Sequence, residues 1–201
     1  RNRITYHFVN KGVSMKLKVA VMALFVGLAS TAWAEDSVTV GYGWQKTTAG
    51  VESRVPALSF KKGLTDSFAV DYSTNTNTTV TDDKVTTRNE LGLNYQQAVA
   101  SSVTGSVRVA HGWKQVSGSE QFRYYVVEPA VSARVANTPV SVKYAYRYRD
   151  AIDSGKAEHN ITNRLQASYD LTKVDKVSIG RDFQRGDGAN RTTQVAYTRS
   201  F

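Results

Sequence analysis

Strict two-residue alternation over segments of about ten residues is the feature that most constrains this chain. In Val140–Arg149 the even positions are Val or Tyr, and the odd positions are Ser, Lys, Ala or Arg. Side chains of a β-strand point alternately to its two faces, so this period predicts a strand with one apolar and one polar, basic face. A length of about ten residues suits a tilted strand that crosses a bilayer.

The same alternation recurs along the chain after Glu35, and no segment there shows the period of an amphipathic helix. The alternating segments begin near Val38, Phe68, Arg88, Val103, Tyr125, Val140, Ile161, Val177 and Val195, and Arg54–Phe60 alternates less clearly. We therefore expect an all-β fold, an antiparallel transmembrane β-barrel of about ten strands. An even number is what single-chain bacterial barrels require.

The expected connections are of two kinds. Regular turns are predicted near residues 61–66, 96–101, 136–139 and 171–176. Connections rich in Asn, Asp, Gly, Ser and Thr are predicted near residues 75–85, 117–120, 150–158 and 184–190. Outer-membrane barrels have short periplasmic turns and longer external loops, so we expect both termini on the periplasmic side.

The N-terminal segment has the pattern of a signal peptide. Met15–Lys18 is basic, an apolar run follows, and Ala32-Trp33-Ala34 has the small-x-small form of a cleavage site. The run is shorter than the ~20 residues of a membrane-spanning helix. We expect residues 1–14 to be upstream translated sequence or a tag, 15–34 a signal peptide and 35–201 an outer-membrane β-barrel.

The charge of the predicted barrel is mild. The whole chain carries a formal net charge of +9, but five of its 26 bases and none of its 17 acids precede Glu35. The remaining excess of bases is small, and no basic run has interleaved aromatics, so nucleic acid is not an expected partner. Cysteine is absent, which excludes disulfides and thiolate metal sites.

Alternation alone does not show which face of the strands contacts water, because a soluble barrel would point its apolar face inward. The signal peptide, the long strands and the aromatic C-terminal strand favour a barrel in the bacterial outer membrane. The lipid bilayer is then one partner, and the barrel-assembly machinery, which would bind the C-terminal strand, is another. The aromatics expected at the membrane interface are Trp44, Trp113, Tyr148, Tyr169 and Phe201.

Two arginines conflict with this membrane orientation. Arg181 and Arg199 have the parity of the lipid face, where an arginine at the midplane costs ~2–4 kcal/mol. Arg199 is close to the strand end and its side chain reaches the interface. For Arg181, a bulge near Gly180 that shifts the register is one explanation.

The polar face of the strands predicts a basic lumen. The bases with this parity are Arg88, Arg108, Lys114, Arg134, Lys143, Arg147, Arg149 and Arg164, and the acids are Glu90, Glu128 and Asp182. A positive lumen favours anions and predicts a ladder of cations for an acidic solute. The alternative is a narrow lumen plugged by Arg–Glu pairs, as in small barrels.

Catalysis has little support in the sequence, and no catalytic residue, cofactor or metal site is predicted. There is no P-loop, nucleophile elbow or His/Cys metal spacing. His111 has lipid parity beside Trp113. His159 adjoins a polar loop with Asp150, Asp153 and Ser154, so a hydrolase or acyltransferase at the loop end is conceivable, but a solvated surface histidine is the commoner arrangement.

The stretch Tyr144–Asp150 (Tyr-Ala-Tyr-Arg-Tyr-Arg-Asp), a polar loop, Asn163-Arg164 and an aromatic-ended terminal strand resemble the oligogalacturonate-specific porin family. The resemblance implies a small monomeric outer-membrane barrel whose lumen carries tracks of basic residues for acidic oligosaccharides. It also implies that Arg147, Arg149 and Arg164 belong to such a track. The family has twelve strands, whereas about ten are found here.

These observations predict an outer-membrane channel, a porin that passes acidic oligosaccharides or other small anions by diffusion, and no enzyme. The alternative is a small closed barrel with a structural or adhesion role, in which the loops bind surfaces or partners.

Overall fold

The computed structural model describes residues 36–81 and 83–201, so the predicted segments 1–14 and 15–34 lie outside the described residues. The described chain forms ten strands. They are β1 (Ser37–Thr47), β2 (Glu52–Gly63), β3 (Phe68–Thr79), β4 (Val85–Ala100), β5 (Val103–Val116), β6 (Phe122–Arg134), β7 (Val140–Ala151), β8 (Asn160–Asp170), β9 (Asp175–Gly186) and β10 (Asn190–Ser200).

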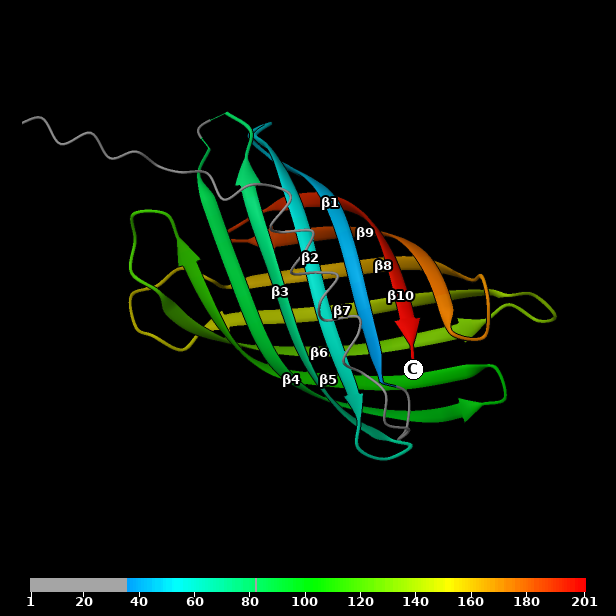
Figure 1. Cartoon of the computed structure of the whole chain (residues 1–201). Helices are drawn as coiled ribbons and strands as arrows, with labels where there is room; N and C mark the ends of the chain where they lie inside the picture. Colours follow the sequence, from blue (N-terminus) through cyan, green and yellow to red (C-terminus); the bar gives the residue numbers. More distant parts are fainter. Residues whose placement is uncertain (1–35, 82) are drawn as a thin grey trace, which may run out of the picture. The chain divides into compact units, whose positions relative to one another are not determined.

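Each strand pairs antiparallel with its sequence neighbours, and β1 pairs with β10 to close the barrel (Figure 1). The closing register runs from Ser37 opposite Ser200 to Thr47 opposite Asn190. This confirms the predicted antiparallel barrel. The number of strands is the ten expected from the alternation and not the twelve of the porin family. No helix among the described residues is long and apolar enough to cross a membrane.

The apolar parity of the strands lies on the outside of the barrel. Leu91, Leu165 and Ile179 are each more than half exposed, and they belong to a large set of exposed Val, Leu, Ile and Tyr side chains. The inner face carries most of the charged side chains, among them the buried carboxylates of Glu90 and Glu128, and a small apolar cluster of Ala110, Tyr124 and Val126. A closed barrel that is apolar outside and polar inside is a transmembrane barrel of the bacterial outer membrane, since closure pairs every strand edge.

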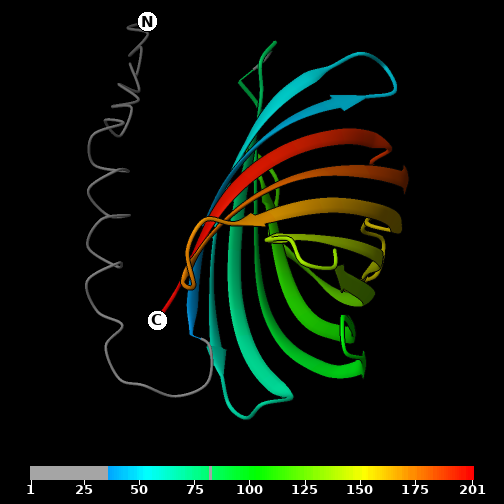
Figure 2. The ribbon, with the colours of Figure 1, turned by 90° about the vertical axis from the view of Figure 1, so that its right-hand side faces the viewer.

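The connections at the two ends of the barrel differ from the prediction in length. Residues 64–67, 101–102, 135–139 and 171–174 join strands at the end that holds the C-terminus, and residues 48–51, 80–84, 117–121, 152–159 and 187–189 join them at the other end (Figure 2). The loops expected at 75–85 and 184–190 were predicted too long. In the first, Asn75 and Asn77 face inward and the alternating β-branched threonines face outward, which continues β3.

The register around Arg181 is regular, so the bulge predicted near Gly180 is wrong. Gly180 pairs with Gln194 on β10 and with Gln166 on β8, without interruption of either ladder. Arg181 therefore stays on the outer face. Its guanidinium lies 5.4 Å from the ring centre of Phe183, two residues nearer the end of the barrel that carries loop 152–159. The side chain thus extends toward the interface, which lowers the cost of its position.

Candidate functional site: a basic wall along a lumen cavity

A cavity of about 890 Å³ runs along the inside of the barrel. It is lined near the C-terminal end by residues such as Thr39 and Thr198, and at the opposite end by the loop residues Thr48 and Ala189. One wall, formed by β1, β2 and β10, presents small or uncharged side chains, among them Gly41, Gly43, Ala57, Ser59, Gln194 and Ala196. The opposite wall is charged.

The charged side of this cavity has more bases than acids. Its bases are Arg88, Lys143, Arg147, Arg149 and Arg164, and its acids are Glu90, Asp182 and Asp187. On β7, Lys143, Arg147 and Arg149 share the inward parity, so they follow one another along the axis of the strand. A solute in the cavity would therefore pass a series of cations.

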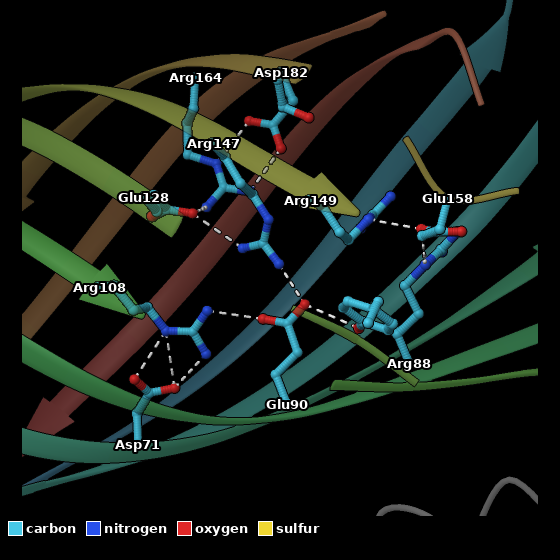
Figure 3. A network of polar contacts seen from close by, with 12 residues as sticks. Asp71, Arg88, Glu90, Arg108, Glu128, Arg147, Arg149, Glu158, Arg164 and Asp182 are labelled. Atoms are coloured by element: carbon cyan, nitrogen blue, oxygen red, sulfur yellow. Dashed lines mark hydrogen bonds and ion pairs between the residues drawn. The ribbon is translucent and has the colours of Figure 1, made fainter. Parts of the chain in front are cut away.

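A network of ion pairs holds the middle of the charged wall (Figure 3). Arg147 donates to the carboxylates of Glu90 on β4 and Glu128 on β6, the second at 3.0 Å. Arg108 contacts Glu90 at 2.8 Å and Asp71 of β3 at 2.6 Å. These charges are thus shared among five strands, β3 to β7, which fixes the guanidinium groups in place.

Arg164 has an ion-pair partner of its own. Its Nε and Nη2 each donate to one carboxylate oxygen of Asp182 on the neighbouring strand, both at 2.8 Å. This bidentate pair is the geometry that planar guanidinium and carboxylate groups prefer. Arg164 also lies 3.9 Å from Glu128, which joins it to the central network.

The loop end of the cavity holds a second cluster, in which three cations surround one carboxylate. Glu158, in the loop between β7 and β8, is 1% exposed. Its Oε1 lies 2.6 Å from Arg149 Nε and 3.5 Å from Arg88 Nε, and Lys114 donates to its Oε2. Burial raises the pKa of Glu158, but Arg149, Arg88 and Lys114 outweigh it and hold the pKa below its usual value. The carboxylate is therefore ionised at neutral pH.

Lys143 differs from the other bases of the cavity. Arg88, Arg147, Arg149 and Arg164 each lie within 4 Å of a carboxylate. Among the described residues no carboxylate is that close to Lys143, which has Gln166 opposite it on β8. Its charge is consequently the least neutralised by a direct partner.

A glycine makes room for the network on β5. Tyr124 of β6 is fully buried, and its hydroxyl donates to Glu90 Oε1 at 3.0 Å. Its ring lies against Gly112, where a Cβ atom would overlap the ring carbons. Any side chain at position 112 would displace Tyr124 and with it a donor to Glu90.

The structure places the predicted lumen bases on the inner face, and one of them, Arg134, has different surroundings from the rest. Arg134 lies at the C-terminal rim, where its side chain is 61% exposed and pairs with Asp170 at 2.6 Å. Three carboxylates were missed, Asp71, Glu158 and the loop residue Asp187. Asp71 alternates with Phe68, Val70 and Tyr72, so its inward parity could have been found. Glu158 lies in a loop, and its direction has no sequence signal.

The predicted interface aromatics all lie on or beside the outer face. Trp44 packs edge-on against Tyr42, Trp113 packs against His111, and both centroid distances are 4.9 Å. Tyr169 and Phe201 are exposed. These placements accord with an aromatic girdle, which stays a prediction.

The histidine considered for catalysis lies outside the lumen. His159 Nδ1 is 3.4 Å from Asp150 Oδ2, which accepts a hydrogen bond from Tyr148 at 2.7 Å. Asp153 instead binds Arg123, at 2.7 Å, and the hydrogen bonds from Arg123 lower its pKa. Of the two loop acids considered with His159, Asp150 therefore lies beside it and Asp153 does not, so the structure brings together only part of the set considered for a hydrolase.

No family model and no curated protein sequence matches the chain. Several solved barrels do. The NanC porin is 10% identical with a TM-score of 0.50, over 82% of this chain and 100% of the porin. A KdgM porin in complex with disordered oligogalacturonate is 11% identical with a TM-score of 0.47, over 82% and 99%. The β domain of the Bordetella autotransporter Brka is 7% identical with a TM-score of 0.49, over 83% and 99%.

At these identities the likeness concerns the fold alone. It agrees with the sequence resemblance to the oligogalacturonate-specific porins as far as the backbone is concerned, although this barrel has ten strands. The chain therefore shares the closed outer-membrane barrel fold of the NanC porin.

Proposed function

We propose that the protein is a passive outer-membrane channel that prefers small anions, with both termini in the periplasm. The observation that carries the proposal is the cavity of about 890 Å³, whose lining residues extend from one end of the barrel to the other. Its bases outnumber its acids, and a low-dielectric wall strengthens the field of uncompensated charge. Anions would therefore enter more readily than cations.

Carboxylate-bearing solutes are the class that this wall suits best. Arg88, Arg149 and Lys114 already hold a carboxylate, that of Glu158. Arginine forms paired hydrogen bonds to such groups, and the small side chains of the facing wall leave room for a solute. Acidic oligosaccharides carry carboxylates at intervals, so they would meet Arg149, Arg147 and Lys143 in succession.

Planar-bilayer recording of the folded protein tests the channel. We expect discrete conductance steps and a reversal potential, in a salt gradient, on the anion side. Replacing Arg147, Arg149 and Arg164 together by Gln should shift that potential toward cations. A matched control replaces Arg123, Arg134 and Arg199, which are also ion-paired but lie outside the cavity. Folded protein without conductance would refute the channel.

A second candidate is a closed barrel with a structural or adhesion role. The ion pairs of Glu90, Glu128 and Asp182 fill part of the interior and neutralise most of the arginines there. In that case folded protein would not conduct, and removing the loops at 80–84 and 152–159 would abolish attachment to a surface or partner. The same recordings separate the two candidates.

A further inference from the structure

The arginines that lack an ion-pair partner are gathered on one part of the outer face. The described chain contains twelve arginines, and eight of them lie within 4 Å of a described carboxylate. The other four, Arg54, Arg181, Arg185 and Arg191, are exposed and have outward parity. They come from β2, β9 and β10. Strands β2 and β10 flank β1, and β9 is the next strand after β10 (Figure 1).

The strand register shows how these arginines are arranged. Arg191 on β10 is opposite Lys46 on one side and Phe183 on the other. One row further along the strands, Trp44 is opposite Arg54 and Thr193. Thr193 is in turn opposite Arg181. Cationic and aromatic side chains therefore occupy two successive rows across four strands.

The only described acid in these rows is Glu52. It is bound to Lys46 at 3.1 Å and so contributes no free negative charge. We call Arg54, Arg181, Arg185 and Arg191, with the flanking rings of Trp44 and Phe183, the arginine patch.

The rows that follow toward the C-terminal end are apolar. Tyr42 is opposite Pro56 and Val195, and Val195 is opposite Ile179. Val195 and Ile179 are exposed on the outer face, where they meet lipid chains. The surface thus changes from apolar to cationic within two residues along each strand. This is the chemical profile of a phosphorylated lipid, with acyl chains below an anionic headgroup.

Arg181 belongs to the patch through the direction of its side chain. Its Cα lies in the middle of β9, but its guanidinium stacks over Phe183 at 5.4 Å, toward Arg185 and Arg191. An arginine in contact with lipid is tolerated when its charge reaches the headgroups. A headgroup phosphate would supply the anion that no described carboxylate supplies.

We propose that the arginine patch binds the phosphate groups of a phosphorylated lipid in the outer leaflet of the outer membrane. The patch lies at the end of the barrel with loop 152–159, which the proposed orientation places outside the cell. Arginine binds phosphate through paired hydrogen bonds, and several such contacts on one rigid sheet face hold one lipid in place. The inference does not depend on channel activity, because the lumen residues take no part.

The test is native mass spectrometry of the folded full-length chain in detergent, titrated with bisphosphorylated lipid A. We expect one lipid to stay bound. Binding should weaken at least about tenfold when Gln replaces all four arginines, Arg54, Arg181, Arg185 and Arg191, since each cation near a lipid phosphate contributes to the affinity. Arg199→Gln, an outer-face arginine paired with Asp175 at the other end, is the control and should bind normally. If the fourfold variant does not fold, the double variant with Arg185→Gln and Arg191→Gln takes its place in the titration.

Two further ligands identify the source of the phosphate. Dephosphorylated lipid A should bind at least about tenfold more weakly than the bisphosphorylated form, and inorganic phosphate at millimolar concentration should not displace the lipid. Equal binding of the dephosphorylated lipid would overturn the proposal. So would equal binding by the folded fourfold or double variant. Displacement by inorganic phosphate alone would reduce the patch to a site for free anions and also overturn it.

Discussion

Glu158 Oε1 lies 2.6 Å from Arg149 Nε at the loop end of the lumen. The loop between β7 and β8 thus brings its own carboxylate to the bases that a solute would meet first. The Nε atoms of Arg88 and Arg149 and Oε1 of Glu158 are buried without a well-aligned hydrogen bond among the described residues. Charge more than directional bonding therefore holds Oε1, whereas Oε2 accepts a hydrogen bond from Lys114.

Glu158→Gln should increase both conductance and anion preference. The change removes one negative charge beside three cations, so the local concentration of anions rises, by on the order of twofold. Single-channel current in a salt gradient measures both quantities. Glu120→Gln is the matched control, because Glu120 lies in a loop at the same end, is 90% exposed and, among the described cations, is paired with Lys156 alone, at 3.8 Å. Equal effects of the two changes would mean that Glu158 has no special role.

The pH dependence of the current should differ between wild type and Glu158→Gln. The pKa of Glu158 is lowered from its usual 4.5 by Arg149, Arg88 and Lys114, which together outweigh the effect of burial. A depressed pKa means that the ion pairs persist as pH falls through 4.5 and are lost only below that value. The wild-type current should therefore stay level from pH 7 to 4.5 and approach that of the variant at lower pH. If the currents of wild type and Glu158→Gln became equal between pH 7 and 5, the pKa of Glu158 would not be lowered.

How much of the structure the sequence predicts differs between the strands and the loops. Alternation is a local property of each strand, so it placed Arg88, Arg147 and Arg164 on the inner face without knowledge of their neighbours. It also predicted the closed ten-stranded barrel. The length of β3 was underestimated because the Asn and Thr residues from position 75 to 79 resemble a loop, whereas inward polar residues are normal in a barrel with a wet interior.

The partners of the lumen bases were harder to foresee. Register decides which carboxylate meets Arg147, and Glu90 lies three strands away from it, with β5 and β6 between them. Glu158 could not be found by parity, because a loop has no fixed alternation. The count of bases against acids therefore overestimated the free positive charge in the lumen.

Lys143→Gln should lower anion preference more than its single charge suggests. Lys143 is the cavity base with no carboxylate within 4 Å among the described residues, so its field is the least cancelled. We expect the permeability ratio of anion to cation to fall about twofold. Arg134→Gln at the exposed rim, where Asp170 neutralises the charge, should change the ratio little. Reversal potentials of the two variants at equal salt gradients give the comparison.

Arg147→Met should destabilise the barrel far more than Arg123→Met. Arg147 bridges Glu90 and Glu128 inside the barrel, and its loss leaves two buried carboxylates that must share the remaining cations. Breaking a buried pair in this way costs ~3–5 kcal/mol. The pair of Arg123 and Asp153 is half-exposed at the rim, where water screens the two charges, so its loss should lower the free energy of unfolding far less.

Urea unfolding of both variants in lipid vesicles, followed by tryptophan fluorescence, measures the difference. Arg147→Lys keeps the charge but reaches the two carboxylates with a single ammonium group, so its stability should lie between those of wild type and Arg147→Met. If Arg147→Met unfolds at the same urea concentration as Arg123→Met, the network is screened by water in the cavity. In that case the arginines of the lumen are available to solutes at little cost to the fold.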